Sequence, residues 1–195
     1  MADITSFYSA GVRHAWVKNA NGDVFDIDAI ITVGADSDVE STEIPGDDAI
    51  KATIYSNNKL SLSVEANSLS FGAYGALTGN VVTQTAAVTG PPAVPQSAEM
   101  LGGTDSELNA PFVEIGAVSV GKTADGKDAY MVRKFYKVQA QRPTSEQGNG
   151  SEVTWSFDAT AYPTTTDIAG GALSKKAIDN VKVVIGQFVD TGAAY

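Results

Sequence analysis

The sequence predicts a mainly β protein, a β-sandwich or partial barrel with one short flanking α-helix and long loops. Two observations lead to this prediction. Residues Phe112–Val120 are β-branched and apolar, Asp125-Gly126 favours a tight reversal, and Ala129–Val138 returns as an aromatic strand. From Val153 to Ala161, apolar residues alternate with polar ones. Because successive side chains of a strand point to opposite faces, this third strand is expected to bury one face and leave the other in water.

The N-terminal part is expected to begin with a hairpin and a loop. Gly11–Val17 is predicted to be the first strand, and Asn21-Gly22 lies in a turn that spans residues 19–23. Residues 24–33 are expected to return as the second strand. The segment 34–48 is polar, acidic and interrupted by Pro45-Gly46, so it is expected to form a long exposed loop.

A second hairpin is expected between residues 49 and 66. Its arms would be Ala49–Tyr55 and Lys59–Ala66, joined by a turn at Asn57-Asn58. Apolar and polar residues alternate along the second arm, which predicts an apolar face and a polar face. The polar face would carry Ser61, Ser63 and Glu65.

The hydrophobic period then changes to that of a helix. Asn67 or Ser68 can cap its start, and Gly79 stands where a left-handed C-terminal residue belongs. Gly72 and Gly75 count against the helix, because each costs about 1 kcal/mol relative to alanine in a helix interior. An apolar stripe at helical spacing nevertheless favours one short helix; it consists of Leu69, Phe71, Tyr74 and Leu77.

The remaining segments are expected to contain loops and two short elements. Residues 83–111 include Gly90-Pro-Pro and Gly102-Gly103, so a second long loop is expected there. A polar loop is expected over 142–150. After Pro163, the pattern favours a short helix near Leu173–Asn180 and a last strand over Val181–Val189.

Composition predicts a single domain that spans residues 1–195. The chain is 43% hydrophobic and 18% charged, as ordinary folded proteins are. No apolar run is long enough for a membrane span, and the N-terminus lacks the pattern of a signal peptide. Cysteine is absent, which excludes disulfides and thiolate metal ligands and suits assembly in a cytosol.

The net charge of −10 is unevenly distributed, with ten acidic and two basic residues in positions 1–48. Proteins that read DNA or RNA present cations to the phosphates, so this charge argues against that class. It is compatible with a protein that lets DNA pass without holding it.

One motif points to nucleotide binding, the run from Gly116 to Thr123, which satisfies the phosphate-loop pattern G-x-x-x-x-G-K-T. That chemistry requires a helix beginning at Lys122, whose positive end faces the phosphates. Here Val118 and Val120 continue a strand pattern, and Asp125-Gly126 follows as a turn. The motif is therefore expected to be a strand running into a hairpin.

Other candidate sites are equally weak. The single histidine, His14, cannot form a typical zinc site alone. Asp36, Asp38 and Glu40 resemble the start of a calcium loop, but the required glycine and distal glutamate are out of place. Asp23, Asp26 and Asp28 are paired as glycosidase carboxylates can be, without an aromatic platform beside them. We therefore expect no enzyme activity, no cofactor and no metal.

Four stretches of this chain resemble the major tail proteins, or tail tube proteins, of long-tailed bacteriophages. The resemblance covers nearly the whole chain but includes no single diagnostic motif. It rests on Gly11–Val17, on Ile54–Lys59, on Ala110–Gly116 with Tyr130–Val138, and on Pro143–Gln147 with Val153–Pro163. The chain departs from the family pattern in Gly90–Gly103 and in the glycine-rich helix.

The resemblance implies a structural virion protein that is assembled in the host cytoplasm. Its partners would be identical copies, in rings expected to be hexamers and stacked into a tube. Tape measure, tail terminator and distal tail proteins would be further partners, DNA would pass through the tube transiently and non-specifically, and no membrane is involved. Two polar faces are candidates for the lumen, of which only one is expected to line the channel: Ser61, Ser63 and Glu65, or Thr154, Ser156 and Asp158.

The two long loops are the candidates for contacts between subunits. The residues singled out there are Asp36, Asp38, Glu40, Glu43, Asp47, Asp48, Pro91, Pro92 and Pro95. The alternative function is a carbohydrate-binding β-sandwich on a virion or cell surface, which would require an exposed aromatic platform. Trp155 is expected in the core instead. A nucleotide hydrolase ranks third and rests on the phosphate-loop pattern alone.

Overall fold

The protein is described from a computed structural model, whose described part contains the helix α1 and the strands β1 to β13. The structure describes residues 6–27, 29–45, 50–87, 95–100, 102, 108–146 and 153–189, and for residues 38–45 and 50–57 it describes the backbone alone. The prediction of a mainly β, sandwich-like fold with one short helix is confirmed. No helix within these ranges is long and apolar enough to cross a membrane.

Most strands belong to one nine-stranded sheet. Its main path runs β2-β1-β7-β8-β10-β4-β3, with β13 paired to β8 and β9 paired to β10. All pairings between these strands are antiparallel. Their bounds are β1 Phe7–Lys18, β2 Val24–Ile27, β3 Ile30–Pro45, β4 Ile50–Ala66, β7 Phe112–Thr123, β8 Asp128–Ala140, β9 Thr144–Glu146, β10 Thr154–Ala161 and β13 Asp179–Ile185.

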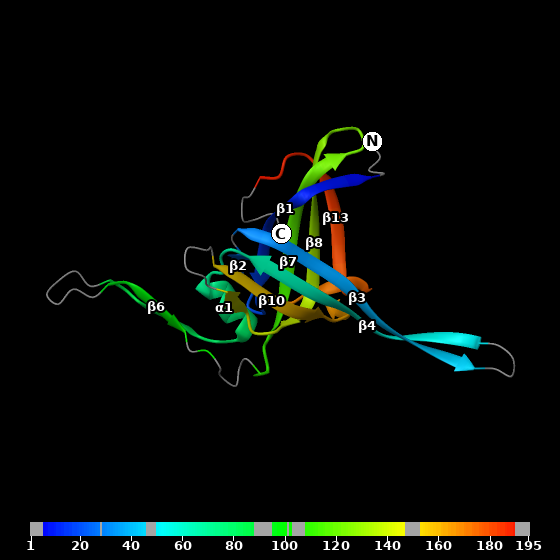
Figure 1. Ribbon diagram of the computed structural model, residues 1–195, viewed down its shortest axis with the longest axis horizontal. Helices are drawn as coiled ribbons and strands as arrows, with labels where there is room; N and C mark the ends of the chain where they lie inside the picture. The colour runs from blue at the N-terminus through cyan, green and yellow to red at the C-terminus, as the bar shows by residue number, and fades with distance from the viewer. Residues whose placement is uncertain are drawn as a thin grey trace.

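The sheet becomes two layers because β8 changes its neighbour halfway along. Its first half, to Phe135, pairs with β13, and Val138–Ala140 pairs with β10. Between Phe135 and Val138, β8 carries an extra residue relative to β7, so both side chains face the core although they are three positions apart. A bulge of this kind bends a strand. In Figure 1, β3, β4 and β10 accordingly cross in front of the upright strands β7, β8 and β13.

The core lies between these two layers. Buried residues of β4 and β10 meet buried residues of β1, β7 and β8, with Leu77 of the helix closing one end. The largest contributions come from fully or almost fully buried apolar side chains: Val17, Ile27, Leu62, Val64, Ile115, Phe135, Val138 and Phe157. The alternation predicted for Val153–Ala161 is confirmed, since Phe157, Ala159 and Ala161 are buried and Asp158 is exposed.

The helix α1 spans Phe71–Thr78 and is capped by Ser70, whose Oγ accepts a hydrogen bond from the Ala73 N–H at 3.1 Å. The predicted caps, Asn67 or Ser68, are wrong, because the helix begins directly after Ser70. Gly79 adopts the predicted left-handed conformation, with φ 76°. Gly72 has a packing role, because a Cβ there would lie 2.5 Å from the ring of Phe25. Phe71 was expected on the buried stripe but is 50% exposed.

The predicted loop 34–48 is wrong over residues 34–45, which belong to strand β3. The predicted turn at Asn57-Asn58 is also wrong, because both residues lie within the single strand β4. The two strands pair from Ile30↔Ala66 to Pro45↔Ile50, and residues 46–49 lie outside the described residues. Asn57-Asn58 lacks the glycine that a two-residue turn favours, and it lies at a register shift inside β4, between the pairs Asp38↔Lys59 and Glu40↔Ser56. The expected return over 24–33 is split into β2 and β3 at Ala29, where φ is 49°.

Three further segments form strands where loops or a helix were expected. Within 83–111, β5 (Val82–Thr85) pairs with β6 (Ser97–Met100). Within 142–150, β9 pairs with β10. The expected helix over Leu173–Asn180 is wrong: β12 (Ala172–Ala177) pairs with β11 (Thr164–Thr166), and Asp179 begins β13. Strand pairing here overrides a weak local helical pattern.

Candidate functional site

The two polar faces predicted from the sequence form a single surface. Strands β4 and β10 are neighbours, with Ser156 opposite Glu65 and Asp158 opposite Ser63. Directly paired residues project to the same side of a sheet. The two sets of polar residues were expected to be separate surfaces, of which only one would line a channel. The register between β4 and β10 instead places them side by side on one surface. Thr154 lies at the end of this surface, where β10 pairs with β9 instead of β4.

The surface continues onto β3, which the sequence analysis did not include. Thr32 lies opposite Glu65, Gly34 opposite Ser63, and Asp36 opposite Ser61. Val33 and Ala35, between them, pack against the core. This alternation over residues 32–36 is readable in the sequence, but the prediction of a loop concealed it. We call the surface formed by Thr32, Gly34, Asp36, Ser61, Ser63, Glu65, Ser156, Asp158 and Thr160 the polar face.

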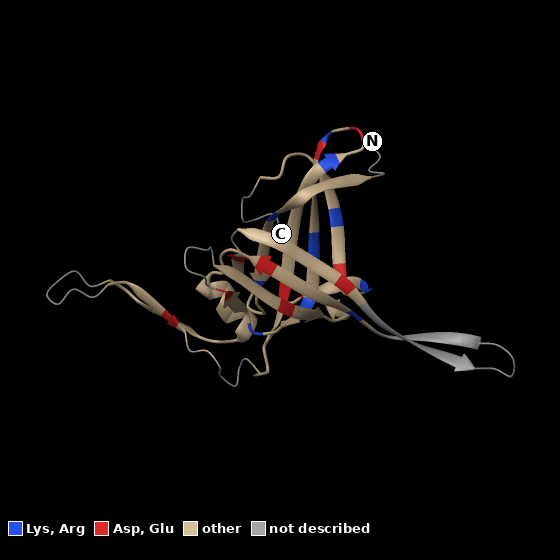
Figure 2. Ribbon diagram, viewed as in Figure 1, with Lys and Arg blue, Asp and Glu red and all other residues tan. Residues whose placement is uncertain are grey.

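The polar face carries three carboxylates, all on exposed residues: Asp36, Glu65 and Asp158. None of them is directly opposite another. Glu65 has Thr32 and Ser156 as its cross-strand neighbours, and Asp158 has Ser63. Like charges placed directly opposite each other destabilise a sheet, whereas hydroxyl neighbours do not. The face therefore presents a spread of negative charge among hydroxyl groups (Figure 2).

Two lysines mark one end of this face, and each lies over an aromatic ring. The Nζ of Lys59 is 5.6 Å from the centroid of the Tyr162 ring, and the Nζ of Lys137 is 4.3 Å from that of Phe112. The two rings pack edge to face, with centroids 5.9 Å apart. Cation–π contacts hold both ammonium groups at this border.

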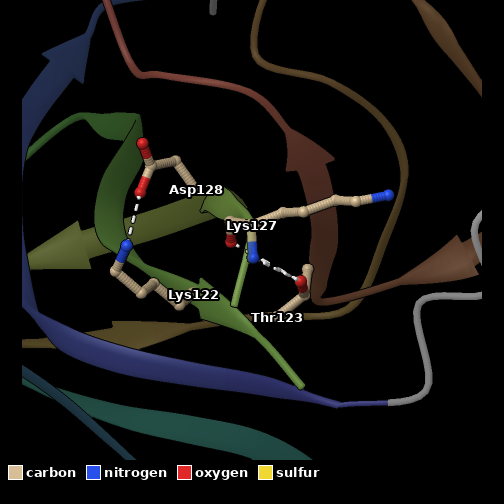
Figure 3. Close-up of polar contacts among 4 residues, drawn as sticks. All are labelled: Lys122, Thr123, Lys127 and Asp128. Carbon is tan, nitrogen blue, oxygen red and sulfur yellow. Dashed lines mark hydrogen bonds and ion pairs between the residues drawn. The ribbon is translucent and has the colours of Figure 1, made fainter. Parts of the chain in front are cut away.

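The phosphate-loop pattern Gly116–Thr123 lies entirely within β7, as the strand pattern predicted. Lys122 Nζ lies 3.0 Å from Asp128 Oδ1 across the hairpin, and the Lys127 N–H donates to Thr123 Oγ1 (Figure 3). Hydrogen bonding and charge from Lys122 lower the pKa of Asp128. The two glycines allow close packing: a Cβ at Gly116 would meet Trp16, and one at Gly121 would meet the Tyr8 backbone. The motif therefore forms one end of a β-hairpin, and it does not precede the helix N-terminus that a phosphate-binding loop requires.

The other sequence candidates are dispersed. His14 is buried, its ring stacks on Trp16, and its Nε2 is 3.4 Å from Asp26 Oδ1. Asp23 accepts a hydrogen bond from the Asn19 side chain in the first turn, and Asp28 lies outside the described residues. No cluster of three potential metal ligands occurs in the parts of the chain that the structure describes.

The two tryptophans do not present an open platform. Trp16 is fully buried, and half-buried Trp155 packs edge to face on Tyr74 at 5.9 Å. Trp155 was expected in the core, and it lies instead at the border of the core beside α1.

The residues proposed for contacts between subunits fall into three groups. Asp36, Asp38, Glu40 and Glu43 belong to β3, so they lie on a strand and not on a loop. Asp47, Asp48, Pro91 and Pro92 lie outside the described residues. Pro95 is exposed, two residues before β6.

No protein-family model matches this chain, and no curated protein matches it in sequence. What the fold and the polar face define by themselves is a class: a two-layered β protein with an acidic, hydroxyl-rich outer face on β3, β4 and β10.

Proposed function

We propose that this chain is a structural subunit that self-assembles into stacked rings, expected to be hexameric, and forms a tube of the phage-tail kind. The tube would be part of a virion and would conduct DNA during ejection. The chain would act by association with its own copies and not as an enzyme. Resemblance in four stretches of sequence suggested this function, and three features of the structure support it.

The observation that carries the proposal is the open border formed by β3. This strand is the last in the nine-stranded sheet and spans Ile30–Pro45, so within the described residues its second edge is not paired with another strand. An uncovered edge of this length is a template for pairing with another chain. Copies arranged head to tail in a closed ring would cover every such edge.

The second feature is that two hairpins extend away from the body. In Figure 1 the β3–β4 hairpin leaves the sheet on one side, and β5–β6 leaves on the opposite side. Within the chain, β3 packs mainly against β4 and β1, and the outer part of its hairpin pairs only with itself. Extended arms of this type gain contacts when a neighbouring copy is present, as large obligate interfaces require.

The third feature is the polar face. A tube that conducts DNA has to repel phosphates, because lysine or arginine on its wall would bind them and release counterions. Asp36, Glu65 and Asp158 place negative charge along the face, while Lys59 lies at its border over an aromatic ring. This arrangement suits a wall along which DNA slides.

The open edge can be tested by placing a charge on it. Ile31 is 45% exposed at the start of β3, where the register with β4 shifts. Ile31→Lys should prevent formation of rings or tubes in negative-stain images, because a lysine on an edge blocks strand pairing. Val81→Lys, at an 82% exposed position outside any strand, is the matched control and should assemble normally. Normal tubes from Ile31→Lys would refute the role of this edge.

A further inference from the structure

A second surface of the protein gathers three lysines, although the chain as a whole is strongly acidic. It is a cavity of about 400 Å³ on the outer side of β7, β8 and β13. Three lysines from three strands line it, together with two acidic residues and a tyrosine: Lys18, Lys134, Lys182, Glu114, Asp167 and Tyr136. We call this cavity the lysine groove.

Strand register explains why the lysines converge. Lys18 of β1 lies opposite Glu114, Lys134 of β8 lies opposite Gly116, and Lys182 of β13 lies opposite Val132. Because Gly116 has no side chain, Lys134 can lie across it, with its Nζ 5.9 Å from the Trp16 ring. The positive charges are thus positioned by the sheet itself.

The floor of the groove contains a buried carboxyl group. Glu114 is 4% exposed, and the charged groups that act on it are those of Lys134, Lys18 and Asp167. Burial raises its pKa, Lys134 and Lys18 lower it in part, and Asp167 raises it. The same burial, with the charges of Glu114, Asp167 and Asp179, raises the pKa of Tyr136.

The chain itself contains an acidic segment suited to this groove. Strand β3 carries Asp36, Asp38, Glu40 and Glu43 within eight residues, and no lysine or arginine occurs between Lys18 and Lys51. From Asp38 to Pro45 the hairpin continues for roughly 20–25 Å at about 3.3 Å per residue. Figure 1 shows that the β3–β4 hairpin leads away from the body of the sheet.

We propose that the lysine groove of one copy receives the acidic β3 segment, Asp36–Glu43, from a second copy. This inference rests on the proposed self-assembly and names the partner surface for its longest arm. Charge complementarity between the two surfaces guides encounter and fixes which copy lies beside which. The contact is sensitive to salt, because exposed charge pairs are screened beyond about 8 Å at physiological ionic strength.

Charge reversal tests the groove first. Lys134→Glu with Lys182→Glu should raise the protein concentration needed for assembly by about a hundredfold, since each of the two lost charged contacts weakens association by about tenfold. A second population carries Glu40→Lys and Glu43→Lys instead of the two groove substitutions. Mixing the two populations should restore assembly, because the acidic groove of the first can then receive the basic β3 segment of the second. Lys127→Glu, in the turn between β7 and β8, is the control and should leave assembly unchanged.

Crosslinking tests the contact directly, because the chain contains no cysteine. One population carries Glu40→Cys or Glu43→Cys, a second carries Lys182→Cys, and the mixture is treated with a short bis-maleimide. The inference predicts a crosslinked dimer with Lys182→Cys and little with Lys127→Cys. Assembled rings without the Lys182 product, or equal yields from both positions, would overturn the docking contact and leave the proposed function intact. Absence of any assembly would overturn both.

Discussion

The indole of Trp16 lies against the backbone of Gly116, the residue directly opposite it on the neighbouring strand. A Cβ at Gly116 would lie 2.0 Å from the ring, and Trp16 is fully buried, so the indole has no space to move aside. The glycine that begins the phosphate-loop pattern is therefore a packing residue. Its neighbour Lys134 uses the same gap to reach the lysine groove.

Gly116→Ala should destabilise the protein by about 1–3 kcal/mol, the usual cost of overpacking a close-packed interior. Urea unfolding would measure this loss of stability as a lower midpoint concentration. The near-ultraviolet circular dichroism signal of Trp16 should weaken as well. Gly34→Ala is the matched control, since a Cβ there would have its nearest contact at 3.8 Å. Equal midpoints for the two variants would contradict the packing role of Gly116.

The buried Glu114 predicts a specific pH dependence of stability. Its pKa is raised in the folded state, so the folded protein holds this proton more tightly than the unfolded chain does. Its stabilising contribution is complete below the unfolded pKa and is lost as pH rises through the folded pKa. Glu114→Gln should therefore be more stable than the parent at pH 7, and the difference should disappear near pH 4. An unchanged difference across this range would contradict the assignment.

Arg133 and Asp179 join β8 to β13 through a salt bridge of 2.8 Å between Nε and Oδ2. Both side chains are about one-third exposed, which places the pair between surface and buried cases. Asp179→Asn should lower the free energy of unfolding by about 1 kcal/mol. A double-mutant cycle with Arg133→Gln measures the coupling, and a coupling of zero would show that strand pairing alone holds β13 in place.

The polar face predicts how assembled tubes interact with DNA. Glu65→Lys and Asp158→Lys should leave assembly intact, because both side chains are exposed, but should cause tubes to retain DNA at low salt and slow its ejection. Retention by the unmodified tubes, or none by either variant, would argue that this face is not the lumen. Lys127→Glu serves as the charge-changing control outside the face.

The parts of the fold that the sequence predicted correctly are those with local signals. Asn21-Gly22 marks the first turn. Gly126, with φ 76°, marks the turn between β7 and β8, and Gly79 marks the end of the helix. Strands β7, β8 and β10 were recognised because they are long and apolar or strictly alternating.

The failures lie where distant strands decide the conformation. Residues 34–45 are acidic and polar, yet they pair along their length with β4, and residues 172–177 pair with β11 instead of forming a helix. The polar faces of β4 and β10 were both predicted, but their union depends on the register Ser156↔Glu65, which no local pattern contains. The lysine groove was missed for the same reason, since its lysines come from strands far apart in sequence.

Self-assembly through the open β3 border is the central claim, and electron microscopy tests it most directly. Purified protein should be concentrated and imaged by negative stain, alone and with its natural tail initiator. The account predicts annuli that stack into hollow tubes, and their loss in Ile31→Lys. Strictly monomeric particles at every concentration, with no annuli or hollow fibres under either condition, would contradict it.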